Sequence, residues 1–255
     1  MAIFSIFDFN INIAPFKFGN IDQSLFKGVA YLGAGSNKLH GTPPQELVIP
    51  WQKKLPPGAD VFTLLNWRAG ISDFKGRTDE ESTLIEWANS DHDVLLKFIC
   101  GDGGVGKSRL AAEFATELSD QHEWAAGFVD LRKAQSFCLP NNGTLLVVDY
   151  PEENRQGVRE FLQDLGGNAG NARLRILFLT RQPLEAWIPL IHDCHTEHLL
   201  DQQPIHLREI APTPAHELYN TALETAAEHF NTIPPPLSQE ALTSWLQQAA
   251  EHARP

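Results

Sequence analysis

A glycine-rich octapeptide between an apolar run and a helical pattern constrains the fold more than any other feature of this chain. Residues 101–108 read Gly-Asp-Gly-Gly-Val-Gly-Lys-Ser. The apolar run at residues 93–100 has the length and character of a buried parallel strand, and Leu110, Phe114 and Leu118 recur at helical spacing afterwards. A strand, a glycine loop ending in Lys-Ser, and then a helix is the order of a phosphate-binding loop.

Each fixed residue of this loop has a physical reason. Glycines let successive N–H groups curl around a phosphate, and the following helix directs its positive end at the same anion. The Lys107 ammonium can bridge β- and γ-phosphates, and the Ser108 hydroxyl can ligate Mg²⁺. The alternative is a glycine-rich turn between two core elements. We expect ATP or ADP to bind here, at Gly101, Asp102, Gly103, Gly104, Val105, Gly106, Lys107, Ser108 and Arg109.

A second apolar run ends in an acid. Residues 145–148 read Leu-Leu-Val-Val, directly before Asp149 and just after a turn at residues 140–143. An aspartate at the C-terminal tip of a buried strand lies at the sheet edge where ligands bind in open α/β folds. Such a pattern can also mark only the end of a strand. Together with the loop it predicts that Asp149 and Ser108 hold Mg²⁺.

Hydrolysis needs a base or a water-positioning group beside Asp149. The next residue is Tyr150, so the usual pair of adjacent acids is absent. We expect Glu152 to fill this role, with Glu153 as the reserve. The alternative is that both glutamates are N-terminal acids of the next helix, where they favour its dipole.

Three more segments have strand character: residues 124–130, 175–181 and 205–207. A strand between the loop strand and the Asp149 strand is typical of the NTPase division with an inserted central strand, which includes the AAA-like and signalling ATPases. No N-K-x-D guanine motif is found. Arg181, at the tip of its segment, is a candidate γ-phosphate sensor, or else a solvated strand-end arginine.

These patterns predict an α/β fold, an ASCE or AAA-like P-loop NTPase with a parallel sheet flanked by helices. We expect an irregular N-terminal extension over residues 1–60, with an amphipathic strand at residues 7–13 and a turn at residues 32–36. The NTPase core then covers residues 61–211. A helical pattern begins at Pro212 and continues from Leu218 to Phe230, and Pro234–Pro236 then break it. Ser238 caps a last helix. We expect these two helices to form a small helical lid over residues 212–255.

A helix entry precedes the loop strand. Thr78 and Glu81 form a capping box with Thr78 as the N-cap, and the helix continues to residues 89–90. Gly76 and Arg77 stand directly before it. In this position they could contact adenine or ribose through their backbone, or they could serve only as the entry to the helix.

Composition narrows the partners. There are 32 acids against 20 bases, a net charge of −12, and no basic stripe, which argues against nucleic acid as the main ligand of this segment. Three cysteines without a C-x-x-C pair suit a reducing cytosol, so we expect a cytoplasmic protein. No apolar run reaches transmembrane length, and residues 1–18 lack a basic n-region. His192, His195 and His198 are expected to be solvated rather than metal ligands.

The chain resembles the STAND class of P-loop NTPases, the signalling ATPases that include NACHT and NB-ARC proteins. The matching stretches are residues 74–77 (Phe-Lys-Gly-Arg), 101–108, 145–153 and 177–181, and the likeness covers roughly residues 61 to 230. Pro151 replaces the alanine of the D-Y-A-E pattern of bacterial members, and Glu152 matches its acid. The resemblance implies a switch that holds ADP at rest, exchanges it for ATP, and oligomerises to activate an effector, often in immunity or phage defence.

Three functions remain open from the sequence. The first is an ATP-binding signalling switch with slow Mg²⁺-dependent hydrolysis, which assembles with itself or with a partner that carries sensor or effector domains. The second is a nucleotide-dependent interaction module without useful catalysis, which the missing acid after Asp149 favours. The third is a P-loop phosphotransferase, for which Arg155 and Arg159 are the only hint of an arginine-bearing lid.

Overall fold

The structure is a computed structural model that describes two compact units. The first unit is built from residues up to Pro50 and from Thr83–Arg208, and the second from Trp51–Ser82 and residues from Glu209 onward. The residues described are 26–32, 46–52, 63, 66–133, 135–140, 142–168, 173–231, 238, 240 and 244. Four of the predicted features lie outside the described residues. They are the strand at residues 7–13, the turn at residues 32–36 beyond Leu32, the break at Pro234–Pro236 and nearly all of the last helix.

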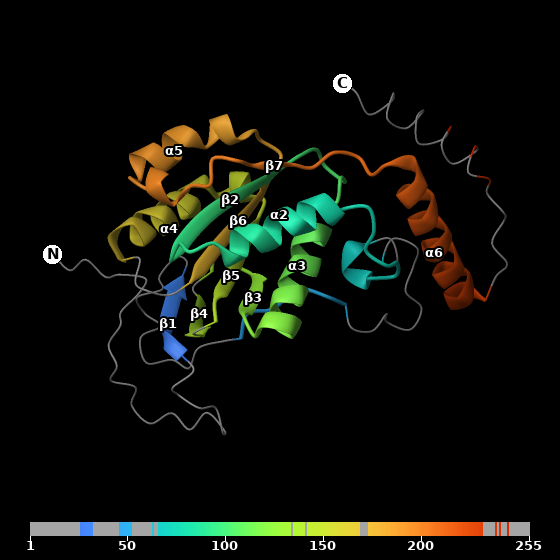
Figure 1. Ribbon diagram of the computed structural model, residues 1–255, viewed down its shortest axis with the longest axis horizontal. Coiled ribbons are helices and arrows are strands. Elements are labelled where there is room, and N and C mark those ends of the chain that lie inside the picture. Colours follow the sequence, from blue (N-terminus) through green and yellow to red (C-terminus); the bar gives the residue numbers. More distant parts are fainter. Residues whose placement is uncertain are drawn as a thin grey trace. The chain divides into compact units, whose positions relative to one another are not determined.

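A five-stranded parallel sheet forms the centre of the first unit (Figure 1). Every residue of β2 and β6, two of the three inner strands, is buried, as expected for parallel strands with helices on both faces. The order across the sheet is β3 (Ala125–Phe128), β5 (Thr144–Asp149), β6 (Leu174–Thr180), β2 (Val94–Cys100) and β7 (Ile205–His206), and all neighbours pair in parallel.

Helices cover both faces of this sheet. On one face lie α2 (Thr78–Asn89) and α3 (Lys107–His122), and on the opposite face α4 (Arg155–Asn168) and α5 (Ile188–Asp193) (Figure 1). Alternate residues of each strand point to opposite faces, so each face has its own apolar layer. The core under α4 and α5 is one cluster that includes Leu96, Phe98, Ile176, Phe178, Phe161, Leu165, Trp187 and Ile191.

The predicted α/β fold with a parallel sheet flanked by helices is confirmed, but the sheet corrects the placement of the inserted strand. The segment at residues 124–130, which precedes Asp149 in the chain, forms β3 at the edge of the sheet. The strand between β2 and β5 is instead β6, which comes later in the chain. This order brings the C-terminal tips of β2, β6 and β5 side by side.

Two segments that were not predicted to be strands form a small second sheet. β1 (Phe26–Leu32) pairs antiparallel with β4 (Gln135–Pro140). The edge of β3 is covered by residues 46–50, since the Phe128 N–H donates to the Val48 oxygen at 3.0 Å. A Cβ on Gly127 would lie 2.7 Å from the Val48 nitrogen, so this close approach requires glycine.

The second unit contains a short 3-10 helix, η3 (Trp67–Ala69), and α6 (Pro212–Phe230). The helical pattern from Pro212 to Phe230 is therefore confirmed. α6 packs against residues 71–76: Lys75 forms an ion pair with Glu217 at 3.1 Å, and the Thr225 hydroxyl donates to the Ile71 oxygen. None of the helices among the described residues combines the length and the apolar character needed to cross a membrane.

The capping box at the start of α2 needs a correction. The helix begins at Thr78 itself, and the Glu81 N–H donates to the Arg77 oxygen at 2.9 Å. Arg77 therefore occupies the N-cap position instead of Thr78. The Arg77 guanidinium forms an ion pair with Glu80 at 3.1 Å, which joins the N-cap residue to the first turn of the helix.

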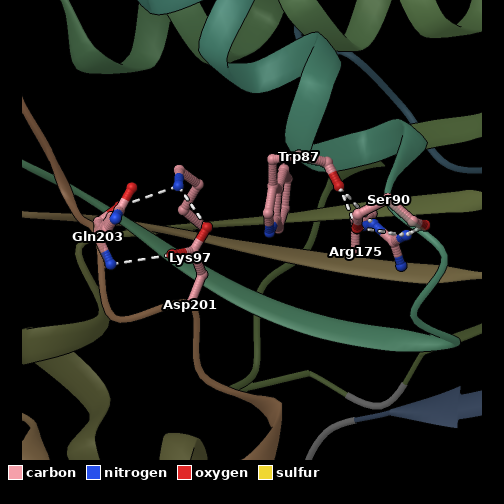
Figure 2. Close-up of polar contacts among 6 residues, drawn as sticks. All are labelled: Trp87, Ser90, Lys97, Arg175, Asp201 and Gln203. Carbon is pink, nitrogen blue, oxygen red and sulfur yellow. Dashed lines mark hydrogen bonds and ion pairs between the residues drawn. The ribbon is translucent and has the colours of Figure 1, made fainter.

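Two cations are buried against the sheet, and both join segments that are distant in the chain (Figure 2). Lys97 of β2 donates to Asp201 Oδ2 at 2.6 Å and to the Gln203 oxygen at 2.9 Å, which fastens the segment before β7 to β2. Arg175 of β6 is fully buried and reaches Trp87 and Ser90 at the end of α2 (Figure 2).

Candidate nucleotide-binding site

The loop between β2 and α3 has the backbone of a phosphate-binding loop. Gly104 and Gly106 have φ values of +83° and +96°, which side chains rarely tolerate. Gly101 lies where a Cβ would be 2.5 Å from the Leu207 oxygen, and its N–H donates to the Thr180 oxygen at 3.2 Å. The loop is therefore fixed to β6 at its start, and glycine is needed at three of its positions.

Lys107 lies under this loop. Its side chain is 7% exposed, and its ammonium donates to the Gly101 and Asp102 oxygens at 2.8 Å each. Burial lowers the pKa of Lys107, while the nearby Asp149 carboxylate opposes that shift. A buried ammonium beside the loop is a localised positive charge for a bound phosphate.

Ser108 and Asp149 meet at the base of the loop. The Ser108 hydroxyl donates to Asp149 Oδ2 at 2.7 Å. The other oxygen, Oδ1, is buried and has no hydrogen-bond partner among the described residues. Burial raises the pKa of Asp149, and the Ser108 hydrogen bond opposes that shift. A hydroxyl and a carboxylate with a spare oxygen fit the oxygen ligands that Mg²⁺ prefers, so these two residues could hold it.

Glu152 contacts the end of the neighbouring strand. Its Oε1 accepts a hydrogen bond from the Arg181 backbone N–H at 3.2 Å, and its Oε2 is buried without a partner within the described part of the chain. The Glu153 side chain is exposed. Of the two candidate glutamates, Glu152 is therefore the one that lies at the tips of β5 and β6.

Arg181 lies between the loop and the residue after Asp149. Its guanidinium carbon is 5.4 Å from the centre of the Tyr150 ring, and a Cβ placed on Gly103 would be 3.6 Å from the same carbon. The expected sensor side chain is therefore adjacent to the phosphate loop. Tyr150 was not singled out from the sequence, although its position directly after Asp149 is the signal that could have found it.

Three further expected residues, Arg109, Gly76 and Arg77, make contacts of their own. Arg109 forms an ion pair with Glu113 at 2.6 Å along α3. Gly76 and Arg77 belong to the second unit, where Gly76 has a φ of +78° and packs against Pro214.

Among the histidines and cysteines that the structure describes, none forms a further site. His192, His195 and His198 are exposed, as expected. No group of three or more His, Cys, Asp or Glu side chains that could hold a metal ion occurs among the described residues. Burial raises the pKa of Cys100, directly before the loop, to about 11, so this thiol stays protonated at neutral pH.

Replacing Asp149 with asparagine should stabilise the ligand-free protein at neutral pH by about 0.5–2 kcal/mol, because it removes a buried charge and keeps an acceptor for Ser108. The pKa of Asp149 is raised in the folded state, so the wild type is most stable, as far as this group is concerned, below the ordinary pKa of 3.8. That stability is lost as the pH rises through the folded pKa. Thermal unfolding at pH 7 and pH 4 should show a gain that shrinks on acidification. A gain that persists at pH 4, or no gain at pH 7, would contradict this explanation.

No family model and no curated protein matches the sequence. The fold is similar to Drosophila ORC bound to DNA, with 13% identity over 62% of this chain and 49% of that chain and a TM-score of 0.42. Domain III of the Thermotoga maritima replication initiation protein DnaA is 12% identical over 64% of this chain and 74% of that chain, with a TM-score of 0.41. C. elegans PCH-2 is 9% identical over 69% of this chain and 54% of that chain, with a TM-score of 0.42. The chain spans about half of the ORC and PCH-2 chains. At such identities the likeness concerns the fold alone.

Proposed function

We propose that the protein is an ATP-binding signalling switch that hydrolyses ATP slowly with Mg²⁺. The observation that carries this proposal is the hydrogen bond between Ser108 and Asp149 at 2.7 Å, directly beside the buried Lys107. A hydroxyl, a carboxylate with a spare buried oxygen and an ammonium converge beneath a glycine loop. This combination of donors suits a nucleoside triphosphate with its divalent cation.

Each residue has one task in this proposal. Lys107 and the loop amides bind the β- and γ-phosphates, and Arg181 detects the γ-phosphate from beside Gly103. Ser108 and Asp149 hold Mg²⁺, which neutralises phosphate charge when it is bound. Glu152 positions the attacking water through its unpartnered Oε2.

Slow hydrolysis follows from the arrangement after Asp149. Tyr150 takes the place of an adjacent acid, and one oxygen of Glu152 is already occupied by the Arg181 N–H. Only the second oxygen is left to orient water. A single, partly engaged carboxylate supports a switch that keeps its nucleotide for long periods.

The wider role is proposed from the resemblance to STAND proteins. ADP is held at rest, and exchange for ATP permits self-association or binding to a partner that carries sensor or effector domains, in a signalling or defence pathway. With a net charge of −12, nucleic acid is not proposed as the main ligand of this chain.

A second candidate is a nucleotide-dependent interaction module without useful catalysis, favoured by the absence of an acid directly after Asp149. The phosphotransferase is disfavoured by the positions of its two arginines. Arg155 donates to the Ala186 oxygen and stacks on Trp187, and Arg159 pairs with Asp193. Both guanidinium groups are thus engaged with the segment of residues 186–193.

The test is to identify the nucleotide that purifies with the wild type, Glu152→Gln and the control Glu153→Gln. We expect ADP from the wild type and from the control, and ATP from Glu152→Gln, whose hydrolysis rate should fall roughly 10²–10⁴-fold. Release of the nucleotide by denaturation and separation by chromatography would measure this. ATP in all three proteins would favour the interaction module. A wild type that binds neither nucleotide, even when either is added, would refute the switch.

A further inference from the structure

We infer that Tyr150 is a positioning residue for Arg181: its ring holds the guanidinium beside the phosphate loop, and so sets how well the site distinguishes ATP from ADP. This inference rests on the proposed function, in which Arg181 detects the γ-phosphate. It adds a residue with no expected role and a specific physical contact through which that residue acts.

The first observation is the place of the guanidinium between two surfaces. Its carbon is 5.4 Å from the centre of the Tyr150 ring, within the range of a cation–π interaction. On the loop side, a Cβ on Gly103 would be 3.6 Å from both the Arg181 guanidinium carbon and one terminal nitrogen. The guanidinium is thus in contact distance of the loop while the ring supports it.

The second observation is the backbone that aims the ring. Tyr150 has φ +52° and ψ +54°, a left-handed conformation that is uncommon for residues other than glycine, asparagine and aspartate. The Tyr150 N–H donates to the Leu179 oxygen of β6 at 3.1 Å, and its own oxygen accepts from the Glu153 N–H at 3.0 Å. The left-handed turn is therefore tied on both sides, and Tyr150 as a whole is 39% exposed, so it is not a core residue.

The third observation is that the same turn contacts both the backbone and the side chain of Arg181. The Arg181 backbone N–H donates to Glu152 Oε1 at 3.2 Å, and the side chain meets the ring of Tyr150. Backbone and guanidinium are both fixed by residues that directly follow Asp149. The freedom of the arginine side chain is reduced before any phosphate binds, and a preorganised cation binds an anion with a smaller loss of entropy.

The test is a double-mutant cycle read as the ratio of ATP to ADP affinity. Tyr150→Asn removes the ring and still tolerates the left-handed backbone, whereas Tyr150→Phe keeps the ring and is the matched control. Each change is made alone and together with Arg181→Gln. All variants are made in the Glu152→Gln background, in which ATP is not hydrolysed during the measurement. Calorimetric titration with ATP and then with ADP gives the two dissociation constants.

We expect Tyr150→Asn to weaken ATP binding about two- to fivefold and to leave ADP binding unchanged, as fits an exposed cation–π contact. Tyr150→Phe should keep the wild-type ratio of ATP to ADP affinity. Tyr150→Asn should have no further effect on this ratio in a protein that already carries Arg181→Gln. If Arg181→Gln shifts the ratio and Tyr150→Asn does not, the inference about Tyr150 fails and the switch stands. If Arg181→Gln leaves the ratio unchanged, the sensor role fails and the positioning role fails with it. An equal loss of ATP and ADP affinity in Tyr150→Asn would show a structural role and overturn the inference.

Discussion

Replacing Lys107 with alanine should remove the bound nucleotide and weaken ATP binding by roughly 10- to 150-fold, the factor that corresponds to one lost hydrogen bond to a charged group. Lys107 is 7% exposed and its ammonium lies 2.8 Å from two loop oxygens. It is thus held in place before a phosphate arrives. Arg181, beside Gly103, would still present a cation to the loop.

The measurement is the amount of nucleotide per protein after purification, followed by titration of ATP and ADP into nucleotide-free protein. Lys133→Ala is the matched control, because the Lys133 side chain is 77% exposed and pairs only loosely with Asp130 at 3.8 Å. Circular dichroism would show that Lys107→Ala is folded. Equal nucleotide content in Lys107→Ala and in the control would exclude this loop as the phosphate site.

Replacing Arg175 with alanine should lower the free energy of unfolding by about 3–4 kcal/mol, since it leaves buried carbonyls without donors and opens a cavity. The fully buried guanidinium donates to the oxygens of Trp87, Asp93, Leu174 and Ser90, and to the Ser90 hydroxyl. α2 has no basic residue in its own last turn, so a residue of β6 supplies the cation at its C-terminus. Burial lowers the pKa of Arg175 to about 10, which still keeps it charged at neutral pH.

Urea unfolding followed by circular dichroism would measure this loss. The matched control is Arg132→Ala, whose side chain is 64% exposed and whose removal should lower the free energy of unfolding far less than the removal of Arg175. Arg175→Lys keeps the charge but not the fork of donors, so it should fall between the two and remain measurable if the alanine variant does not fold. A loss in Arg175→Ala no larger than in the control would show that the network contributes little.

The local patterns of the chain predicted the elements of the fold well. β2, α3, β5 and β6 come from apolar or helical runs with clear boundaries, and turn residues lie between them. The pattern did not show that β6 inserts between β2 and β5, because the order of strands depends on contacts between distant segments. β1 and β4 were missed for a related reason: two short strands form a sheet only because each pairs with the other.

Some parts of the candidate site could be predicted from local sequence patterns, and others could not. Residues within the octapeptide are fixed by local geometry, so their places followed from the motif. The contact of Ser108 with Asp149 could be expected from the topology. Outside the site, the burial of Lys97 could not be expected, because its partner Asp201 is more than a hundred residues away in the chain. Tyr150 could not be assigned either, since its role depends on the conformation of one residue and on the neighbouring strand.

The neighbours of β2 also impose an order on synthesis. Among the described residues, the strands that pair with β2 are β6 and β7, and both are translated after α4. β3 and β5 can pair with each other earlier, but they reach β2 only through β6. On the ribosome, the strand that carries the phosphate loop therefore waits with both edges open, which is the condition under which nascent chains aggregate or need a chaperone.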